Sequence, residues 1–256
     1  MSELVKVERN GRVAVVTMNV PRRRNALALP LVQALETTMR QLMDDAELRA
    51  VVLRGEGGHF CAGGDLSSLD ASLLETRAGM QVGHRMIRTL VEGRLPVIAA
   101  VEGNAYGAGF SIAMACDHVI ADAKSSFCAA FGRVGLMPDY GLLWTLPQRV
   151  GLAVAKEIVL FCEAIGGTEA RELRVVDRLA DEGKVLELAL ERAHRLASAP
   201  PASLATTKAA FARVPMSLDV TLAWEADTQT VLVGSEDFKE GARAFLEKRA
   251  PIFVGR

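Results

Sequence analysis

Two glycine-rich turns carry residues whose type and spacing could do chemistry. Gly107-Ala108-Gly109 follows the apolar run at residues 97–101 and opens an apolar helix of small residues, and Gly63-Gly64 follows another apolar run at residues 50–53. The first N–H groups of a helix have no intrahelical partner, and the helix dipole attracts negative charge to that end. If both turns aim an N–H group at one point, they form an oxyanion hole for a carbonyl oxygen. The spacing also fits two ordinary tight turns of an α/β protein, and that alternative stays open.

Asp139 is the second candidate. It lies in the segment GLMPDYG at residues 135–141, among small and apolar neighbours. A carboxylate that is only partly solvated has a raised pKa and can shuttle a proton near neutral pH. An aspartate directly after a proline is also typical of a turn or a helix cap, so the functional reading competes with a structural one.

Two other kinds of site are weaker candidates. Gly107 and Gly109 lack the third glycine of a dinucleotide fingerprint, and no acidic residue closes a following strand. Ser111 lies in a degenerate nucleophile elbow, GFSIA, but a serine hydrolase needs a histidine partner. His194 falls in a charged helix and His118 beside a strand start, so no catalytic triad is indicated.

The elements that must position these residues alternate between strands and helices. The Asn-Gly pair at residues 10–11 predicts a hairpin over residues 4–18. Further strands are predicted at 50–53, 97–101, 117–121 and 175–179, and helices at 29–43, 71–92 and, with a break near Gly151, 142–161. Residues 127–141 are predicted to be irregular. From residue 200 onward only helices are expected, which predicts an α/β core at 1–199 and a helical appendage at 200–256.

Composition limits the class of protein. The chain has 256 residues, half of them apolar, and a formal net charge of −1, which argues against a general nucleic-acid binder. The four cysteines show no C-x-x-C spacing, so we expect free thiols in a reducing compartment and no metal site. The N-terminal residues do not form a signal peptide and no run is long enough to span a membrane. We therefore expect a cytoplasmic protein without membrane partners.

Several motifs, in this order, resemble the crotonase (enoyl-CoA hydratase/isomerase) family. They are RRRNAL at 22–27, FCAGGDL at 60–66, EGNAYGAGFSIAMACD at 102–117, the stretch 132–151, and the ending FLEKR at 245–249. The resemblance covers nearly the whole chain. It implies a crotonase-like spiral of ββα turns with a C-terminal helical trimerisation domain, assembled as a homotrimer or a dimer of trimers.

The resemblance also implies roles for single residues. It puts the two oxyanion N–H groups on Gly64 and Ala108, where they would polarise the thioester carbonyl of an acyl-CoA substrate. Residues expected along the coenzyme A and acyl path are Arg22, Arg24, Asn25, Ala26, Ala62, Asp65, Leu66, Ser111, Phe131, Phe245 and Lys248. The last two match positions that often reach the coenzyme A of a neighbouring subunit. From residue types alone, the three arginines at 22–24 fit either a solvated face or a polyphosphate contact.

The departures from the family pattern decide the expected reaction. Family hydratases use two glutamates to activate water, and these fall here on Ser111 and Phe131. Asp139 instead matches the single acid of enoyl-CoA isomerases and of the ring-opening isomerases of phenylacetate breakdown. An aromatic dehalogenase branch also has an aspartate there, but it needs aromatic walls, and aromatics are only 5% of this chain.

We therefore predict an enoyl-CoA isomerase that uses Asp139 as a proton shuttle and needs no metal or redox cofactor. The alternatives are an enoyl-CoA hydratase, which is a lyase, with unusual residues, and a non-catalytic acyl-CoA-binding scaffold. The helix predicted at 71–92 is expected to roof the acyl pocket.

Overall fold

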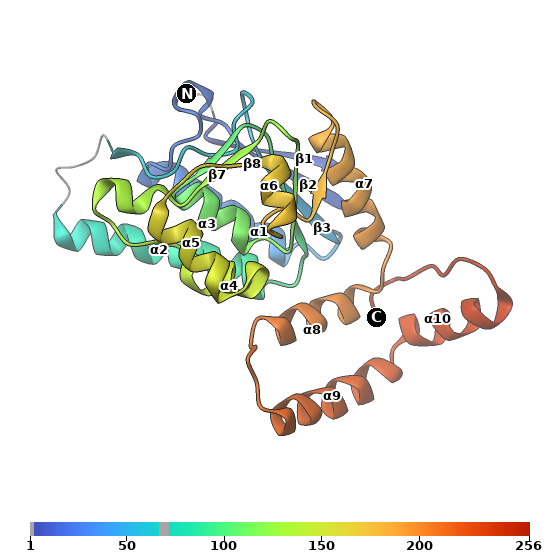
Figure 1. The fold of residues 1–256 in the computed structure, drawn as a ribbon. Helices are drawn as coiled ribbons and strands as arrows, with labels where there is room; N and C mark the ends of the chain where they lie inside the picture. The colour runs from blue at the N-terminus through green and yellow to red at the C-terminus, as the bar shows by residue number, and fades with distance from the viewer. Residues whose placement is uncertain (1–2, 67–71) are drawn as a thin grey trace.

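The computed structural model describes residues 3–66 and 72–256, which form an α/β body and three C-terminal helices that project from it (Figure 1). The body contains a six-stranded sheet in the order β1-β2-β3-β4-β6-β9. Its strands are β1 (Val5–Asn10), β2 (Val13–Met18), β3 (Ala50–Gly55), β4 (Val97–Val101), β6 (His118–Ala121) and β9 (Arg178–Leu179). β1 and β2 form the predicted antiparallel hairpin, and every other pair in this sheet is parallel.

A second, smaller sheet contains β5 (Asn104–Tyr106), β7 (Ser126–Cys128) and β8 (Ile165–Gly166). The chain enters the two sheets in turn, because β4 is followed by β5 and β6 by β7. The spiral of successive turns that results places the short strands β5, β7 and β8 side by side in a sheet of their own. It also places the ends of both glycine-rich turns at this second sheet.

Three local predictions were wrong in part. The strand at residues 97–101 does not lead straight into a helix, because β5 intervenes. The strand predicted at 175–179 pairs only at β9, since Val175 and Val176 are packed in the core before it. The stretch 127–141 is not wholly irregular, because it begins in β7 and contains a 3₁₀ helix, Ala130–Val134. Short elements of two to five residues show too few side chains for a periodic pattern to identify them.

Helices cover both faces of the main sheet. They are α1 (Leu29–Asp44), α2 (Leu73–Glu92), α3 (Ala108–Ala115), α4 (Leu142–Val150), α5 (Leu152–Phe161), α6 (Gly167–Glu172) and α7 (Val185–Ala197). α1 buries Leu31, Leu35, Met39 and Leu42, which share one helical face. α2 begins with a capping box formed by Ser72 and Glu75, while Ala71 of the predicted helix lies outside the described residues.

The C-terminal part is helical, as predicted. It contains α8 (Pro201–Phe211), α9 (Leu218–Val233) and α10 (Glu236–Glu247), of which α9 and α10 lie away from the α/β body (Figure 1). The domain boundary at residue 199 stays a prediction. Within the described part of the chain, no helix combines the length and apolar character needed to cross a membrane.

Candidate active site

The two glycine-rich turns lie against each other. Cys61 pairs with β5, since its N–H donates to Asn104 O at 2.9 Å and its carbonyl accepts from Tyr106 N at 2.9 Å. A Cβ placed on Gly63 would lie 2.9 Å from Tyr106 O and 3.6 Å from Gly107 Cα. The backbones of the first and second turns are therefore in direct contact, and β5, which the sequence did not reveal, brings them together.

Two glycines of the second turn are required by geometry. Gly107 has φ 50° and ψ −125°, a conformation that side chains with a Cβ rarely adopt. A Cβ on Gly109 would lie 2.6 Å from both Cβ and O of Cys61. Glycine at these positions lets the start of α3 approach the first turn closely, which is how two backbone N–H groups can converge.

The N–H groups of Gly64 and Ala108 are free to bind a ligand. Leu27 pairs with the residues on either side of Gly64, because Leu27 N donates to Gly63 O at 2.8 Å and Asp65 N to Leu27 O at 3.3 Å. Ala108 is the first residue of α3, where an N–H has no intrahelical acceptor. Among residues 3–66 and 72–256, neither N–H has a protein acceptor. This pair can stabilise negative charge on a carbonyl oxygen.

Asp139 lies in the turn that precedes α4, and its carbonyl accepts from Leu142 N at 3.1 Å. Its side-chain Oδ1 is enclosed and has no hydrogen-bond partner in the described part of the chain. Burial raises the pKa of this carboxyl to about 6, opposed only in part by its own backbone N–H. A carboxyl with this pKa is half ionised near pH 6 and can both accept and return a proton near neutral pH.

Tyr140 is the buried residue that directly follows Asp139. Burial is the main cause that raises the pKa of its phenol, followed by the charges of Asp139 and Cys61. The sequence analysis did not single out Tyr140, although an aromatic directly after the candidate acid was a usable signal in a chain with few aromatics.

Ser111 and Phe131 are both buried. The Ser111 hydroxyl donates to Gly107 O at 3.4 Å, one turn back along α3, so the side chain bonds to its own helix. This geometry does not support the serine-hydrolase alternative. Phe131 lies in the 3₁₀ helix and packs in the main hydrophobic core. Neither position carries a carboxylate.

The predicted coenzyme A segment has two kinds of residue. Arg22 and Arg24 are exposed and available to a ligand, and Ala26 is half-buried. Asn25 is fully buried and its amide is used within the protein: Oδ1 accepts from Val20 N, and Nδ2 donates to the carbonyls of residues 56 and 59. The Asn25 side chain thus holds the loop that presents its neighbours.

The other predicted binding residues are divided between the body and the projecting helices. Ala62, Asp65 and Leu66 border the first glycine turn, and Asp65 forms an ion pair with Arg23. Phe245 lies in α10 and Lys248 is its C-terminal cap, both exposed. Since α10 lies apart from the body, a single chain does not bring these two residues to the site (Figure 1).

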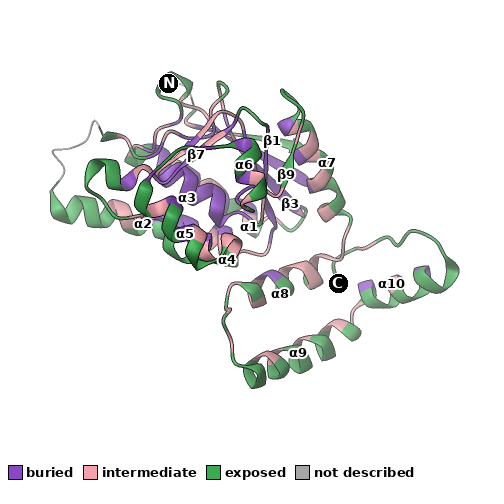
Figure 2. Ribbon diagram, in the orientation of Figure 1, coloured by how far each residue is buried: buried purple, intermediate pink, exposed green. Residues whose placement is uncertain are grey.

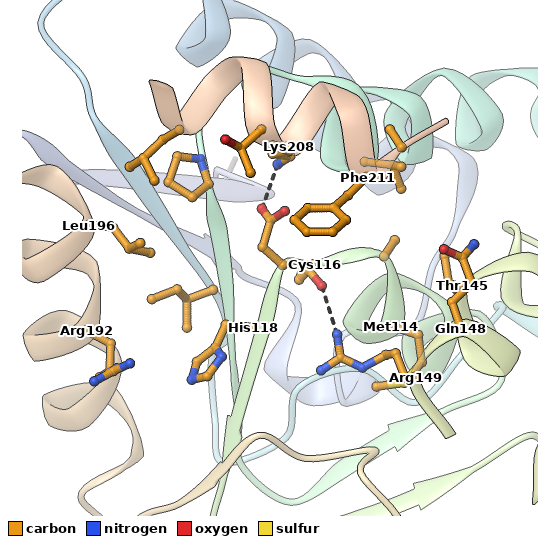
Figure 3. A pocket seen from close by; sticks show the side chains of 18 of the residues that line it. Met114, Cys116, His118, Thr145, Gln148, Arg149, Arg192, Leu196, Lys208 and Phe211 are labelled. Atoms are coloured by element: carbon orange, nitrogen blue, oxygen red, sulfur yellow. Dashed lines mark hydrogen bonds and ion pairs between the residues drawn. The ribbon is translucent and has the colours of Figure 1, made fainter. Parts of the chain in front are cut away.

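A cavity of about 620 Å³ lies at the opposite end of α3, between α4, α7 and α8 (Figure 3). Lys208 of α8 is buried at its edge, where Nζ donates to Asp117 Oδ2 at 2.6 Å and to Leu95 O at 2.8 Å. Asp139, Gly64 and Ala108 do not line this cavity. Lys208 carries no local signal in the sequence, because its partner Asp117 is 91 residues away.

The chain matches known proteins over almost its whole length. The model of the enoyl-CoA hydratase/isomerase family matches residues 8–256. A Rhodobacter capsulatus protein named "Probable enoyl-CoA hydratase" is 38% identical over 254 residues, which are 98% of each chain. The 1,2-epoxyphenylacetyl-CoA isomerase of Escherichia coli is 33% identical over 262 residues, with full coverage of both chains.

Solved structures agree with these relatives. An enoyl-CoA hydratase from Polaromonas sp. JS666 has a TM-score of 0.92 and 34% identity, covering 98% of this chain and 99% of its own. The enoyl-CoA hydratase from Bacillus anthracis has a TM-score of 0.95 and 28% identity, covering 99% and 100%. The predicted fold class, a crotonase-like ββα spiral with a helical C-terminal region, is confirmed. The chain belongs to the enoyl-CoA hydratase/isomerase family.

Proposed function

We propose that this protein is an enoyl-CoA isomerase that moves a double bond, or opens a ring, in an acyl-CoA substrate. One observation carries the proposal. Asp139 is a half-buried carboxyl with a pKa raised to about 6 by burial, and the two positions where family hydratases carry glutamates hold Ser111 and Phe131. A single acid that both accepts and returns a proton suits isomerisation, whereas hydration needs groups that activate water.

The proposed reaction is a 1,3-proton shift. Asp139 takes a proton from the allylic carbon of a 3-enoyl-CoA, and the electrons of that C–H bond delocalise onto the thioester oxygen. The N–H groups of Gly64 and Ala108 stabilise the resulting dienolate, and this stabilisation makes the carbon acidic enough for a carboxylate base. Asp139 then returns the proton at another carbon and the dienolate collapses.

The acyl-CoA would extend from the hole past the first glycine turn. Arg22 and Arg24 can pair with its phosphates, and Ala62, Asp65 and Leu66 border the path of its acyl arm. In residues 3–66 and 72–256, no three His, Cys, Asp or Glu side chains are grouped as a metal site. We propose that the proton shift uses only groups of this chain, without a redox cofactor, and that the enzyme serves the acyl-CoA chemistry of fatty acid metabolism in the cytoplasm.

We also propose that the chain works as a homotrimer or a dimer of trimers. α9 has no buried residue, although it contains leucines, valines and a tryptophan. An apolar helix left in solvent is typical of an interface with another chain. In such an assembly Phe245 and Lys248 of one chain could reach the coenzyme A of its neighbour.

A hydratase is the second candidate, because relatives of this chain carry that name. Incubation of the protein with a 3-enoyl-CoA and, separately, a 2-enoyl-CoA in deuterated water separates the two reactions. We expect the double bond to move without a hydroxyl product, as measured by mass spectrometry, with deuterium entering the acyl chain only as far as Asp139 exchanges its proton with solvent before returning it. Formation of a 3-hydroxyacyl-CoA would instead establish hydration.

Asp139→Asn tests the catalytic group itself and the scaffold alternative with it. We expect turnover to fall about 10²- to 10⁴-fold, because the amide cannot carry the proton. Asp181→Asn, at an exposed position away from the site, is the matched control and should keep wild-type turnover. If neither the wild type nor the control acts on any enoyl-CoA, the protein is a non-catalytic acyl-CoA-binding scaffold.

A further inference from the structure

Tyr140 has a strained backbone conformation that contacts with the surrounding residues must stabilise. Its φ is 48°, a left-handed conformation uncommon for a bulky residue, and only 7% of its surface is exposed. Residues on both sides are special as well, since Asp139 is the proposed base and Gly141 caps α4 with φ 75°. A left-handed tyrosine in such a turn persists only where contacts of its side chain stabilise it.

The ring of Tyr140 is seated against Gly83 of α2. A Cβ on Gly83 would overlap the ring carbons and lie 2.6 Å from the phenol oxygen. One turn further along α2, Ile87 Cγ2 lies 3.5 Å from the position of a Cβ on Gly141. Glycine is unfavourable within a helix, so Gly83 has a packing reason for being there. The face of α2 formed by Gly83 and Ile87 thus rests on the turn that follows Asp139.

The carboxyl of Asp139, the residue before Tyr140, is partly enclosed. Oδ1 of Asp139 is enclosed without a partner, and burial is the main cause of the raised pKa of that carboxyl. The phenol of Tyr140 also has a raised pKa, from burial and then from Asp139 and Cys61, so it stays neutral and adds no charge beside the carboxylate. The ring can therefore exclude water while leaving the charge of Asp139 unpaired.

We propose that Tyr140 is a positioning residue that, seated in the notch left by Gly83, fixes the turn of Asp139 against α2 and shields its carboxyl from water. The inference rests on the proposed function, because it assumes that Asp139 is the working base. It extends that function by making α2 part of the catalytic apparatus: whatever moves α2 changes the environment of the base.

Four variants test the contact by turnover of a 3-enoyl-CoA. Tyr140→Ala admits water to Asp139, and Gly83→Ala forces the ring out of its notch, so we expect kcat to fall at least tenfold in each, with KM changed less than threefold. Tyr140→Phe keeps the ring and should rescue kcat to within about threefold of wild type. The double variant Gly83→Ala/Tyr140→Ala should be no slower than Tyr140→Ala alone, because the added methyl then meets no ring.

Gly79→Ala is the matched control. Gly79 lies one turn earlier in α2, and a Cβ there would meet only Leu29 Cδ1 at 3.6 Å, an ordinary contact. We expect it to leave kcat unchanged. Equal losses in Gly79→Ala and Gly83→Ala, or additive losses in the double variant, would overturn the positioning role. Melting curves identify any variant that fails to fold, and Gly83→Ala then replaces Tyr140→Ala as the decisive variant.

A titration of Asp139 by carboxyl ¹³C NMR, with Asp139→Asn to assign the signal, tests the inference without any substrate. We expect the pKa of Asp139 to fall from about 6 toward its ordinary value in Tyr140→Ala and Gly83→Ala, and to stay near 6 in Tyr140→Phe and Gly79→Ala. An unchanged titration in Tyr140→Ala refutes the shielding. If the wild type isomerises no enoyl-CoA but these shifts occur, the proposed function fails while the positioning role stands.

Discussion

Helices α3 and α9 are both apolar, but α3 is buried in the protein and α9 is exposed to solvent. All eight residues of α3 are buried, and the helix begins at the second glycine-rich turn. None of the sixteen residues of α9 is buried (Figure 2). Leu218, Leu222 and Val231 of α9 are at least half exposed. One helix has all its packing partners within the chain, and the other has almost none.

This difference divides the chain into two regions. The α/β body covers its apolar helices within one chain and is here called the complete region, whereas the C-terminal helices leave theirs exposed and are called the incomplete region. The proposed oxyanion hole and the proposed base Asp139 are both built from the α/β body, so we expect their chemistry to need no second chain. The C-terminal helices leave a large apolar surface in solvent, which a soluble protein covers by association. The comparison therefore predicts that the proton-transfer groups depend on local backbone geometry, while assembly and the far end of the substrate depend on α9 and α10.

We expect the largest effect on turnover from a substitution in the complete region that removes one N–H donor from the proposed oxyanion hole. In Ala108→Pro, proline occupies the first position of α3, where it suits the helix, but the donor is lost. We expect kcat for the 3-enoyl-CoA to fall about 10²- to 10³-fold with an unchanged oligomer mass. Steady-state kinetics and light scattering measure the two quantities. Wild-type turnover in this variant would show that Ala108 N–H is not a donor in the reaction.

The incomplete region is tested by making α9 polar. Leu222→Glu together with Val231→Glu places charges on its exposed apolar surface, and we expect the protein to sediment as a single chain instead of a trimer or hexamer. Gln229→Glu, an exposed polar position of the same helix, is the control and should keep the oligomer. A wild-type protein that already sediments as a single chain would contradict the assignment of α9 to an interface.

The ion pair of Lys208 with Asp117 links α8 to the α/β body, and its removal tests how much this link stabilises the protein. Lys208→Met leaves Asp117 without its buried cation, so we expect a loss of about 2 kcal/mol in stability, or roughly 4–8 °C in melting temperature. Lys184→Met removes an exposed ion pair with Glu187 and should leave the melting temperature unchanged. Equal melting of Lys208→Met and the wild type would mean that α8 is not fastened to the body by this pair.

The smallest expected effect is on the melting temperature, because ionisation of the half-buried Asp139 lowers the stability of the folded protein. The pKa of Asp139 is raised from an ordinary 3.8 to about 6, so the folded protein holds its proton more tightly than the unfolded chain does. Stability therefore falls as pH rises from about 4 to about 6, and the cost is complete above 6. Asp139→Asn does not titrate, so we expect it to melt about 3–6 °C above the wild type at pH 8, where the shift is halved for the partial exposure of the carboxyl, and level with it near pH 4. An equal difference at both pH values would exclude this linkage.

The sequence predicted the features that depend on local chemistry. Asn10-Gly11 identified the hairpin, helical spacing identified α1 and α2, and the glycine pairs identified both turns. Asp139 was predicted to be partly desolvated because its sequence neighbours are apolar, and the enclosed Oδ1 agrees with this.

Features that depend on contacts across the chain were not predictable. β5 has three residues inside a glycine-rich stretch, too few to show a period, yet it joins the two turns. Asn25 looked like a ligand contact because of its motif, whereas its amide holds a loop, and only the fold brings residues 56 and 59 to it. The seating of Tyr140 on Gly83 depends on where α2 crosses the body. A one-dimensional pattern holds no information about that crossing.

Packing Gly109 onto Cys61 has a consequence for chemical sensitivity. Cys61 is fully buried, and burial raises the pKa of its thiol to about 12. The neutral thiol is therefore the main form near pH 7, whereas the thiolate is the form that reacts with peroxide and alkylating agents. A cysteine beside the oxyanion hole would otherwise be the weak point of the enzyme under oxidative stress. We therefore expect the close packing at the proposed oxyanion hole to protect Cys61 from electrophiles as well.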